Sequence, residues 1–447
     1  MNLTIKFSAL QLLLGLSFLL HSCTETIDPP PPSTNVIQLS LQEASYSKAF
    51  LKITLPDTLT PRSVVLKRNG TVVASLLMQK RDTIIVDSNL VPKTTYTYLA
   101  LRLRDTTAIE QSQPLQVTTR LKSPRDFSWT VDTLAYPGSM QTLMRKIYAT
   151  SPENVYLVGA NERGYGKMYH YDGRTWEPVK LSNLEGGYIS GAIDLWSIYG
   201  FRQDNIYAVG SKLELNQHPP PNILDSSFIM HYDGTEWREV MLPKKGRTVE
   251  SIWGADPNDI WAGGTEGAFY HYDGVSWKYM PFDSSIAVWD IFGFSRNEVY
   301  AILFKKIDLV QPDDSMKIFF YHYDGNTWSA KDSSYLYFAQ RFGHAKLWGN
   351  SSSNLFSSGL GIFQSRGASW ERIFHPGIVM LAMHGRTEND ILVAGTESRI
   401  FHFDGESWME LKTPKNSNVI FFTLWYSDSA AFIIGQDGGK TYIYTGK

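Results

Sequence analysis

Side chains that could bind a ligand lie in two kinds of segment of this 447-residue sequence: the starts of recurring apolar runs and the longest loops between those runs. Several apolar runs begin with a charged residue, and the loops contain tyrosine, phenylalanine, arginine and histidine. Aromatic faces beside arginine and carboxylate groups suit sugar or peptide ligands. The candidate ligand-binding residues are Tyr188, Tyr335, Tyr337, Arg341, Phe342, His344, Arg145, Glu250 and Asp290.

An enzymatic alternative would depend on the carboxylates Glu250, Asp290 or Asp194, because most glycosidases use a carboxylate pair at a defined separation. A sialidase-like enzyme would need three converging arginines and a tyrosine nucleophile, and here only Arg145 and Arg341 are plausible. There is no His-x-His pair or Glu-x-x-His motif for a metal. We therefore predict a binding protein with no catalytic residue, no metal site and no cofactor.

These candidates must be positioned by a repeat, whose best-preserved part is His-Tyr-Asp-Gly followed three residues later by Trp. Alternating apolar residues, an Asp-Gly turn and a Trp-led segment predict a β-hairpin. Because the repeat recurs throughout the second half of the chain, we interpret its residues as structural rather than as ligand sites. They are Asp172, Gly173, Trp176, Asp233, Gly234, Trp237, Asp273, Gly274, Trp277, Asp324, Gly325, Trp328, Trp370, Asp404, Gly405 and Trp408.

Each repeat also contains two earlier strands, the second of which commonly ends in glycine, so that one repeat predicts a four-stranded propeller blade. The first-strand motif occurs seven times, whereas the last repeat stops before its fourth strand. The missing strand is predicted at Trp129, where the sequence parallels the segment beginning at Trp176. Residues 126–447 are therefore predicted to form a seven-bladed β-propeller closed by an N-terminal strand.

The longest loops all belong to connections that emerge on one face of such a ring. Residues 211–227 and 305–317 join second strands to third strands, while residues 182–194 and 332–345 join successive repeats. Binding residues concentrate on variable loops held by a rigid frame. We therefore expect the ligand on this face, and not on the face of the Asp-Gly turns.

The repeat resembles propeller repeats of bacterial surface proteins and is similar to kelch and Asp-box repeats, but it matches neither of the latter two. Asp-box motifs place one residue between Asp and Gly, whereas Asp172 and Gly173 are adjacent. Kelch repeats share the paired glycines of Gly263 and Gly264 but have a longer segment before the Trp. No activity is implied by either resemblance.

The N-terminal segment predicts export and lipid anchoring. An apolar run too short to span a membrane precedes Leu20-His21-Ser22-Cys23, which resembles a bacterial lipobox. This resemblance implies a signal peptide over residues 1–22, lipidation of Cys23 and, with no Asp after Cys23, the outer membrane or cell surface of a Gram-negative bacterium. Prolines in residues 23–35 predict a stiff linker.

Residues 36–121 contain seven short alternating segments and predict a β-sandwich. Leu90-Val91-Pro92-Lys93-Thr94-Thr95-Tyr96 resembles the segment that leads into the sixth strand of fibronectin type III domains. The resemblance implies that Tyr96 forms a tyrosine corner, with its hydroxyl group bonded to the preceding loop.

The net charge of -2 offers no basic field for nucleic acid. We therefore predict an all-β, non-catalytic surface lipoprotein that contacts the membrane through Cys23 and binds an extracellular glycan or protein. The alternatives are an extracellular polysaccharide-active enzyme and a structural scaffold of an envelope complex.

Overall fold

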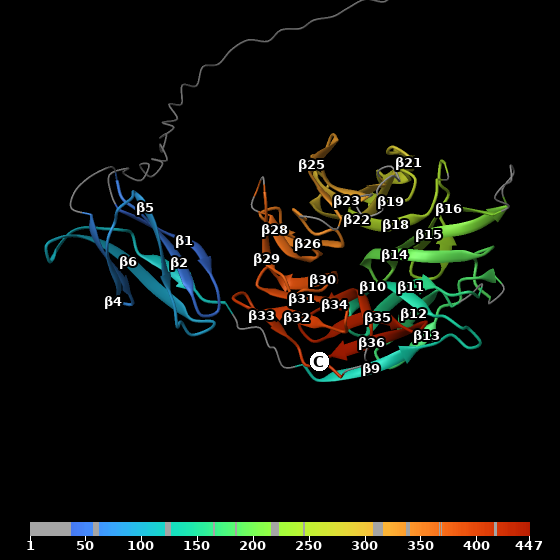
Figure 1. The fold of residues 1–447 in the computed structure, drawn as a ribbon, viewed down its shortest axis with the longest axis horizontal. Helices are drawn as coiled ribbons and strands as arrows, with labels where there is room; N and C mark the ends of the chain where they lie inside the picture. Colours follow the sequence, from blue (N-terminus) through green and yellow to red (C-terminus); the bar gives the residue numbers. More distant parts are fainter. Residues whose placement is uncertain are drawn as a thin grey trace, which may run out of the picture. The chain divides into compact units, whose positions relative to one another are not determined.

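The structure is a computed structural model that describes residues 37–56, 62–120, 127–163, 166–183, 186–215, 223–244, 246–306, 316–336, 340–365, 367, 369–414 and 418–447. All the named elements in these ranges are β-strands (Figure 1), as predicted. None of the described residues belongs to a helix long and apolar enough to cross a membrane. The chain divides into two compact units, Met1–Arg120 and Leu121–Lys447. The predicted signal peptide, Cys23 and the linker lie outside the described residues.

The first unit contains two antiparallel sheets whose buried side chains form one core. The three-stranded sheet contains β1 (Gln38–Ala44), β2 (Ala49–Thr54) and β5 (Asp82–Asp87). The second sheet contains β3 (Ser63–Arg68), β4 (Thr71–Leu77), β6 (Thr95–Arg104), β7 (Thr107–Gln111) and β8 (Leu115–Thr118). The seven predicted segments are all strands, and the sequence analysis missed only β7. The Val91 backbone N–H donates to the Tyr96 hydroxyl oxygen at 2.8 Å, which ties the start of β6 to the loop before it.

The second unit contains seven four-stranded antiparallel sheets among its described residues. The first three are β10 (Leu143–Ser151), β11 (Asn154–Ala160), β12 (Met168–Tyr171) and β13 (Trp176–Pro178); β14 (Ile193–Arg202), β15 (Asn205–Leu215), β16 (Ile223–Tyr232) and β17 (Trp237–Glu239); and β18 (Val249–Asp256), β19 (Asp259–Gly264), β20 (Phe269–Tyr272) and β21 (Trp277–Tyr279). The fourth and fifth are β22 (Ile286–Ser295), β23 (Glu298–Lys306), β24 (Met316–Tyr323) and β25 (Trp328–Tyr335); and β26 (Lys346–Ser351), β27 (Asn354–Gly359), β28 (Gly361–Ser365) and β29 (Trp370–Phe374). The sixth is β30 (Met380–Thr387), β31 (Asp390–Gly395), β32 (Ile400–Phe403) and β33 (Trp408–Glu410), and the seventh is β34 (Ile420–Tyr426), β35 (Ala431–Asp437), β36 (Lys440–Gly446) and β9 (Trp129–Leu134).

The first strands of successive sheets contact one another in order from β10 to β34, and β34 in turn contacts β10. The sheets therefore form a closed ring around a centre lined by first strands (Figure 1). Repeated four-stranded antiparallel sheets in such a ring form a β-propeller.

Strand β9 comes from the start of this unit but completes its last sheet. It pairs with β36 from Trp129↔Gly446 to Leu134↔Thr441. Trp129 also packs against Phe127, with ring centroids 5.2 Å apart. Closure by a distant strand covers the edge that β36 would otherwise expose.

The Asp-Gly repeat forms the turns between third and fourth strands. In the first sheet, Asp172 Oδ1 accepts hydrogen bonds from the backbone N–H groups of Arg174 at 2.8 Å and Thr175 at 2.9 Å, and these bonds lower the pKa of Asp172. Gly173 has φ +93°, a conformation that glycine adopts readily. Equivalent side-chain bonds form at Asp233, Asp273, Asp324 and Asp404.

The repeated His and Trp residues pack within and between sheets. His170 pairs with Tyr156 across β11 and β12, and its ring stacks on Tyr156 at 4.4 Å. Trp237 of the second sheet contacts Tyr156 of the first sheet edge-on at 6.2 Å. Trp277 makes the equivalent contact with Tyr207 at 6.4 Å, so the Trp joins neighbouring sheets.

We expect Trp129→Ala to lower the free energy of unfolding of the second unit by about 2–3 kcal/mol, because it removes a half-buried aromatic contact of the closing strand. Urea denaturation followed by tryptophan fluorescence would measure the change. Thr130→Ala, at an exposed position of the same strand, is the control and should change stability by less than about 0.5 kcal/mol. Equal stability of the two variants would contradict a stabilising role for β9.

Candidate functional site

A β-bulge near the start of the first strand is shared by six of the seven sheets. At each bulge, one residue has no partner on the second strand, and its side chain is redirected from the regular alternation. The bulged residues are Arg145, Trp196, Glu250, Trp289, Leu381 and Phe422. In the fifth sheet, Ala345 occupies the corresponding place directly before β26.

The glycine at the end of the second strand makes this bulge possible. A Cβ atom at Gly264 would lie 1.8 Å from the carbonyl oxygen of Thr248, immediately before the start of β18. Side chains at Gly159, Gly210 and Gly395 would meet equivalent carbonyl oxygens at 1.9–2.1 Å. The repeated glycine is therefore required by the close approach of the bulged strand.

The bulged residues, together with Ala345, line one cavity of about 480 Å³, which we call the channel cavity. All seven sheets contribute to it, and Leu143, Lys146, Asp290, Lys346 and Gln436 complete its lining. Trp289 is 45% exposed and Phe422 is 37% exposed. The cavity thus presents large apolar surfaces beside charged groups, which is typical of ligand sites. The bulges lie near the ends of first strands that follow the sheet-to-sheet connections.

Arg145, Trp196 and Glu250 form one charged side of the channel cavity. The Arg145 guanidinium lies 3.9 Å from the Trp196 ring centroid, and its Nη1 donates to the Leu195 carbonyl oxygen at 3.3 Å. Burial lowers the pKa of Arg145. Burial also raises the pKa of Glu250 to about 7, and the nearby Arg145 opposes this rise only in part. Near neutral pH, Glu250 can therefore donate or accept a hydrogen bond.

Two lysines share the Asp290 carboxylate on the other charged side. Asp290 Oδ1 lies 2.7 Å from Lys346 Nζ and 3.8 Å from Lys146 Nζ, while Oδ2 accepts the Leu347 backbone N–H at 2.8 Å. Burial and the neighbouring Lys346 lower the pKa of Lys146 to about 7. Because Asp290 is 1% exposed and bridges the fourth and fifth sheets, its first role is to hold those sheets together.

Several residues that were predicted to bind the ligand do not line the channel cavity. Phe342 is fully buried between Phe320 and Trp370, so its prediction as a ligand residue was wrong: the loop uses this side chain to fill the core. His344 is half-buried, with Nδ1 2.7 Å from Gln340 Nε2, and burial lowers the pKa of His344 to about 4.

The remaining predicted residues are spread over the outer parts of the ring. Tyr188 is 68% exposed at a different cavity between the first and second sheets. Tyr335 is 46% exposed at the end of β25. Arg341 lines a cavity beside Trp370. Tyr337 lies outside the described residues.

Sequence reasoning found Arg145, Glu250 and Asp290 but missed the apolar members of the channel cavity: Trp196, Trp289, Leu381 and Phe422. These residues follow a buried apolar residue in an apolar run and therefore resemble core positions. A fixed spacing in the sequence marks these residues. In each first strand, an aromatic or apolar residue precedes the glycine or its equivalent, and the cavity residue lies three positions before that aromatic or apolar residue.

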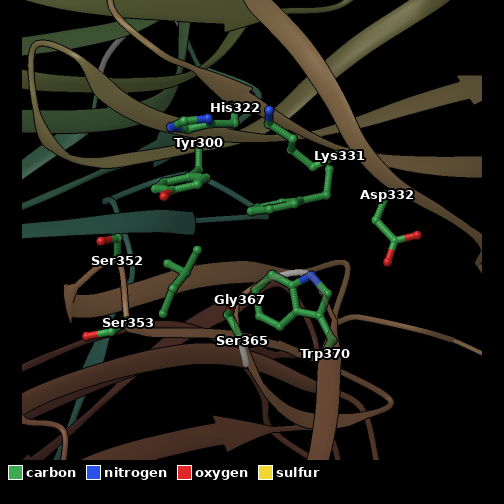
Figure 2. Close-up of a pocket in the computed structure, with 11 residues that line it drawn as sticks. Tyr300, His322, Lys331, Asp332, Ser352, Ser353, Ser365, Gly367 and Trp370 are labelled. Carbon is green, nitrogen blue, oxygen red and sulfur yellow. The ribbon is translucent and has the colours of Figure 1, made fainter.

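A second hollow, the inter-sheet groove, lies between the fourth and fifth sheets and has a volume of about 800 Å³. Figure 2 shows Tyr300, His322 and Lys331 on one side and Trp370 on the other, with Asp332 at one end. Trp370 and Asp332 also line an adjoining cavity of about 570 Å³. Among the described residues, no group of three or more His, Cys, Asp or Glu side chains is arranged to hold a metal ion.

We expect Gly264→Ala to lower the free energy of unfolding by about 3–4 kcal/mol, because the added methyl group meets the Thr248 carbonyl oxygen. The matched control is Gly367→Ala. Gly367 has φ +76°, but the added Cβ atom would have no heavy atom within 4 Å beyond the neighbouring residues. That control should cost only about 1 kcal/mol, from backbone conformation alone. Thermal and urea denaturation would measure both, and equal losses would show that the bulge tolerates a side chain.

We expect Glu250→Gln to change how stability depends on pH. The pKa of Glu250 is higher in the folded protein than its ordinary value of 4.5, so ionisation between pH 4.5 and about 7 destabilises the native protein but not the variant. The variant should therefore gain about 1–3 kcal/mol in the free energy of unfolding relative to the native protein as pH rises through this range. Urea denaturation at several pH values would measure the gain. Glu177→Gln, at an exposed position of β13, is the control, and a pH-independent difference for Glu250→Gln would refute the expectation.

No protein-family model matches the sequence, and no curated protein matches it. Solved structures similar to this chain include YCF48 bound to a D1 peptide, with a TM-score of 0.50 and 18% identity, covering 71% of this chain and 96% of that chain. The WD40 β-propeller domain of Doa1 has a TM-score of 0.49 and 12% identity, covering 71% of this chain and 97% of that chain. At this level of identity, the first similarity supports the fold and nothing beyond it.

Proposed function

We propose that the second unit is a seven-bladed β-propeller that binds a segment of another protein in the channel cavity. The observation that carries this proposal is the convergence of one side chain from each of the seven sheets on a single cavity. These side chains vary in chemistry from sheet to sheet, whereas the surrounding frame repeats. Variation on a constant frame is typical of binding surfaces.

The exposed rings of Trp289 and Phe422 would contact an apolar side chain of the ligand, since burying such surfaces drives association. Arg145, Lys146 and Lys346 outnumber Glu250 and Asp290, and this positive excess persists near neutral pH, where the raised pKa of Glu250 and the lowered pKa of Lys146 offset one another. The ligand segment would therefore carry a carboxylate beside its apolar side chain. YCF48, a structure of similar fold, was solved with a bound D1 peptide.

We further propose that the chain is a surface lipoprotein anchored through Cys23 in the outer membrane, as its lipobox-like sequence implies. The first unit would act as a fibronectin type III-like spacer. Its support is the strand order of its two sheets and the hydrogen bond from Val91 to the Tyr96 hydroxyl group. The alternative is that the protein is a structural scaffold of an envelope complex, whose other subunits would bind to the same surfaces.

The polysaccharide-active alternative would use Glu250, whose raised pKa suits a general acid. Its second carboxylate would be Asp290, but both oxygens of Asp290 already accept bonds from Lys346 and Leu347. A carboxylate held in this way is poorly placed to attack a sugar or to activate water. The geometry therefore favours binding.

Selection of a displayed peptide library on purified residues 24–447 would test the proposal. We expect enriched peptides with an aromatic or aliphatic residue near an acidic one, and at least about tenfold weaker binding by a Trp289→Ala/Phe422→Ala variant. A Met241→Ala/Val275→Ala variant is the matched control, because these residues are 92% and 87% exposed and do not line the channel cavity. Enrichment that survives the loss of Trp289 and Phe422 would refute the site, and binding to a glycan array instead of peptides would refute the ligand class.

A further inference from the structure

The inter-sheet groove differs from its counterpart between the first and second sheets. In that counterpart, Trp237 contacts Tyr156 at 6.2 Å, and the hollow beside them has a volume of about 340 Å³. Between the fourth and fifth sheets, Trp370 instead contacts Phe320 edge-on at 5.1 Å and Phe342 at 6.1 Å. The space in front of Tyr300 therefore remains open, and the hollow is more than twice as large.

The change coincides with a departure from the repeat. The fifth sheet has Ser365-Arg366-Gly367-Ala368 where the other repeats have an aromatic residue, Asp-Gly and one further residue. The turn before its second strand includes Ser352 and Ser353, both exposed and both lining the groove. The loss of the Asp-Gly turn beside this hollow indicates that these residues are selected for something other than the frame.

His322 is the one repeated histidine whose bonding pattern differs. In the first, second, third and sixth sheets, the histidine Nε2 lies 2.6–2.9 Å from an Asn or Asp side chain at the start of the second strand. Glu298 occupies that place in the fourth sheet, but its Oε1 accepts from the Tyr300 hydroxyl at 3.1 Å. Within the described residues, the buried His322 Nε2 has no hydrogen-bond partner.

The groove and its adjoining cavity carry excess positive charge. Lys331 lines the groove, and Arg341 and Arg372 line the adjoining cavity, to which Trp370 also contributes. The acidic residue of the lining is Asp332, which lies 3.4 Å from Arg341 and is thus partly neutralised. Lys331 and Arg372 are exposed, so their charges face solvent.

We propose that this groove is a second binding site, which takes an acidic oligosaccharide. One sugar ring would stack on the half-buried Trp370 indole, which lines both cavities. Carboxylates of the sugar chain would pair with Lys331, Arg341 and Arg372. Its hydroxyl groups match the seryl hydroxyls of Ser352, Ser353 and Ser369, which donate and accept equally.

An acidic peptide would use the same positive charges but would not need an indole flanked by serine hydroxyls. The groove shares no lining residue with the channel cavity, so this proposal does not rest on the function proposed for that cavity. The two sites lie at different parts of the ring: the channel cavity is built mainly by first strands, whereas the groove is built by the second, third and fourth strands of the fourth and fifth sheets and by turns of the fifth.

The test is calorimetric titration of the full chain with galacturonate oligomers. We expect saturable binding that weakens at least about tenfold in a Lys331→Ala/Arg372→Ala variant and in Trp370→Ala. An Arg174→Ala/Lys180→Ala variant makes the same charge change at exposed positions of the first sheet and should bind as the native protein does. Trp289→Ala/Phe422→Ala should also bind normally, because it alters only the channel cavity.

Two comparison ligands separate charge from sugar recognition. Neutral galactose oligomers should bind at least about tenfold more weakly, and poly-glutamate should fail to compete with galacturonate. Competition by poly-glutamate together with unchanged affinity in Trp370→Ala would overturn the sugar assignment in favour of an acidic peptide. Equal binding of neutral oligomers would overturn the acidic assignment. Absence of galacturonate binding by the folded native protein would overturn the proposal altogether, and thermal denaturation of each variant would exclude loss through unfolding.

Discussion

The pairing of β9 with β36 is the interaction on which the second unit depends. Each of the other sheets is built from consecutive strands, so its edges are set by local hairpins and by packing on its neighbours. The last sheet would end at β36, and the ring could then open between its first and last repeats. Strand β9 joins residues more than three hundred positions apart in sequence and thereby ties the start of the unit to its last sheet, beside the contacts of β34 with β10 that close the ring.

Within that closed ring, the frame and the candidate sites use different residues of the same repeat. Asp-Gly turns, stacked histidines and tryptophans between sheets keep neighbouring strands in register. The bulge on six of the seven first strands removes one residue from that register and directs it to the channel cavity. The close approach between Gly264 and Thr248 shows how the frame accommodates the bulge, because the space for a side chain is occupied by a carbonyl oxygen.

The strand pattern and the position of the closing strand were predictable because both depend on local sequence. Asp172, Gly173 and Trp176 specify a hairpin by themselves, and Trp129 matches the strand that the last repeat lacks. Of the residues that line the channel cavity, only charged ones were predicted from the sequence. Trp289 and Phe422 resemble core residues in an apolar run, and their exposure follows from a one-residue register shift that hydrophobic alternation does not reveal. The inter-sheet groove was not predictable, since it depends on Trp370 packing against Phe342 from a distant loop.

The bulges also have a consequence for how such a protein can diverge. A bulged residue lacks a partner on the neighbouring strand, and in Trp289 and Phe422 much of the side chain faces open space. Replacing such a residue alters the cavity while leaving the ladder, the turns and the glycine contact in place. The six bulged positions can therefore change one at a time, each by a single mutation, while the hydrogen-bonded frame is kept. A ring of this kind can acquire new recognition by gradual steps while its architecture stays the same.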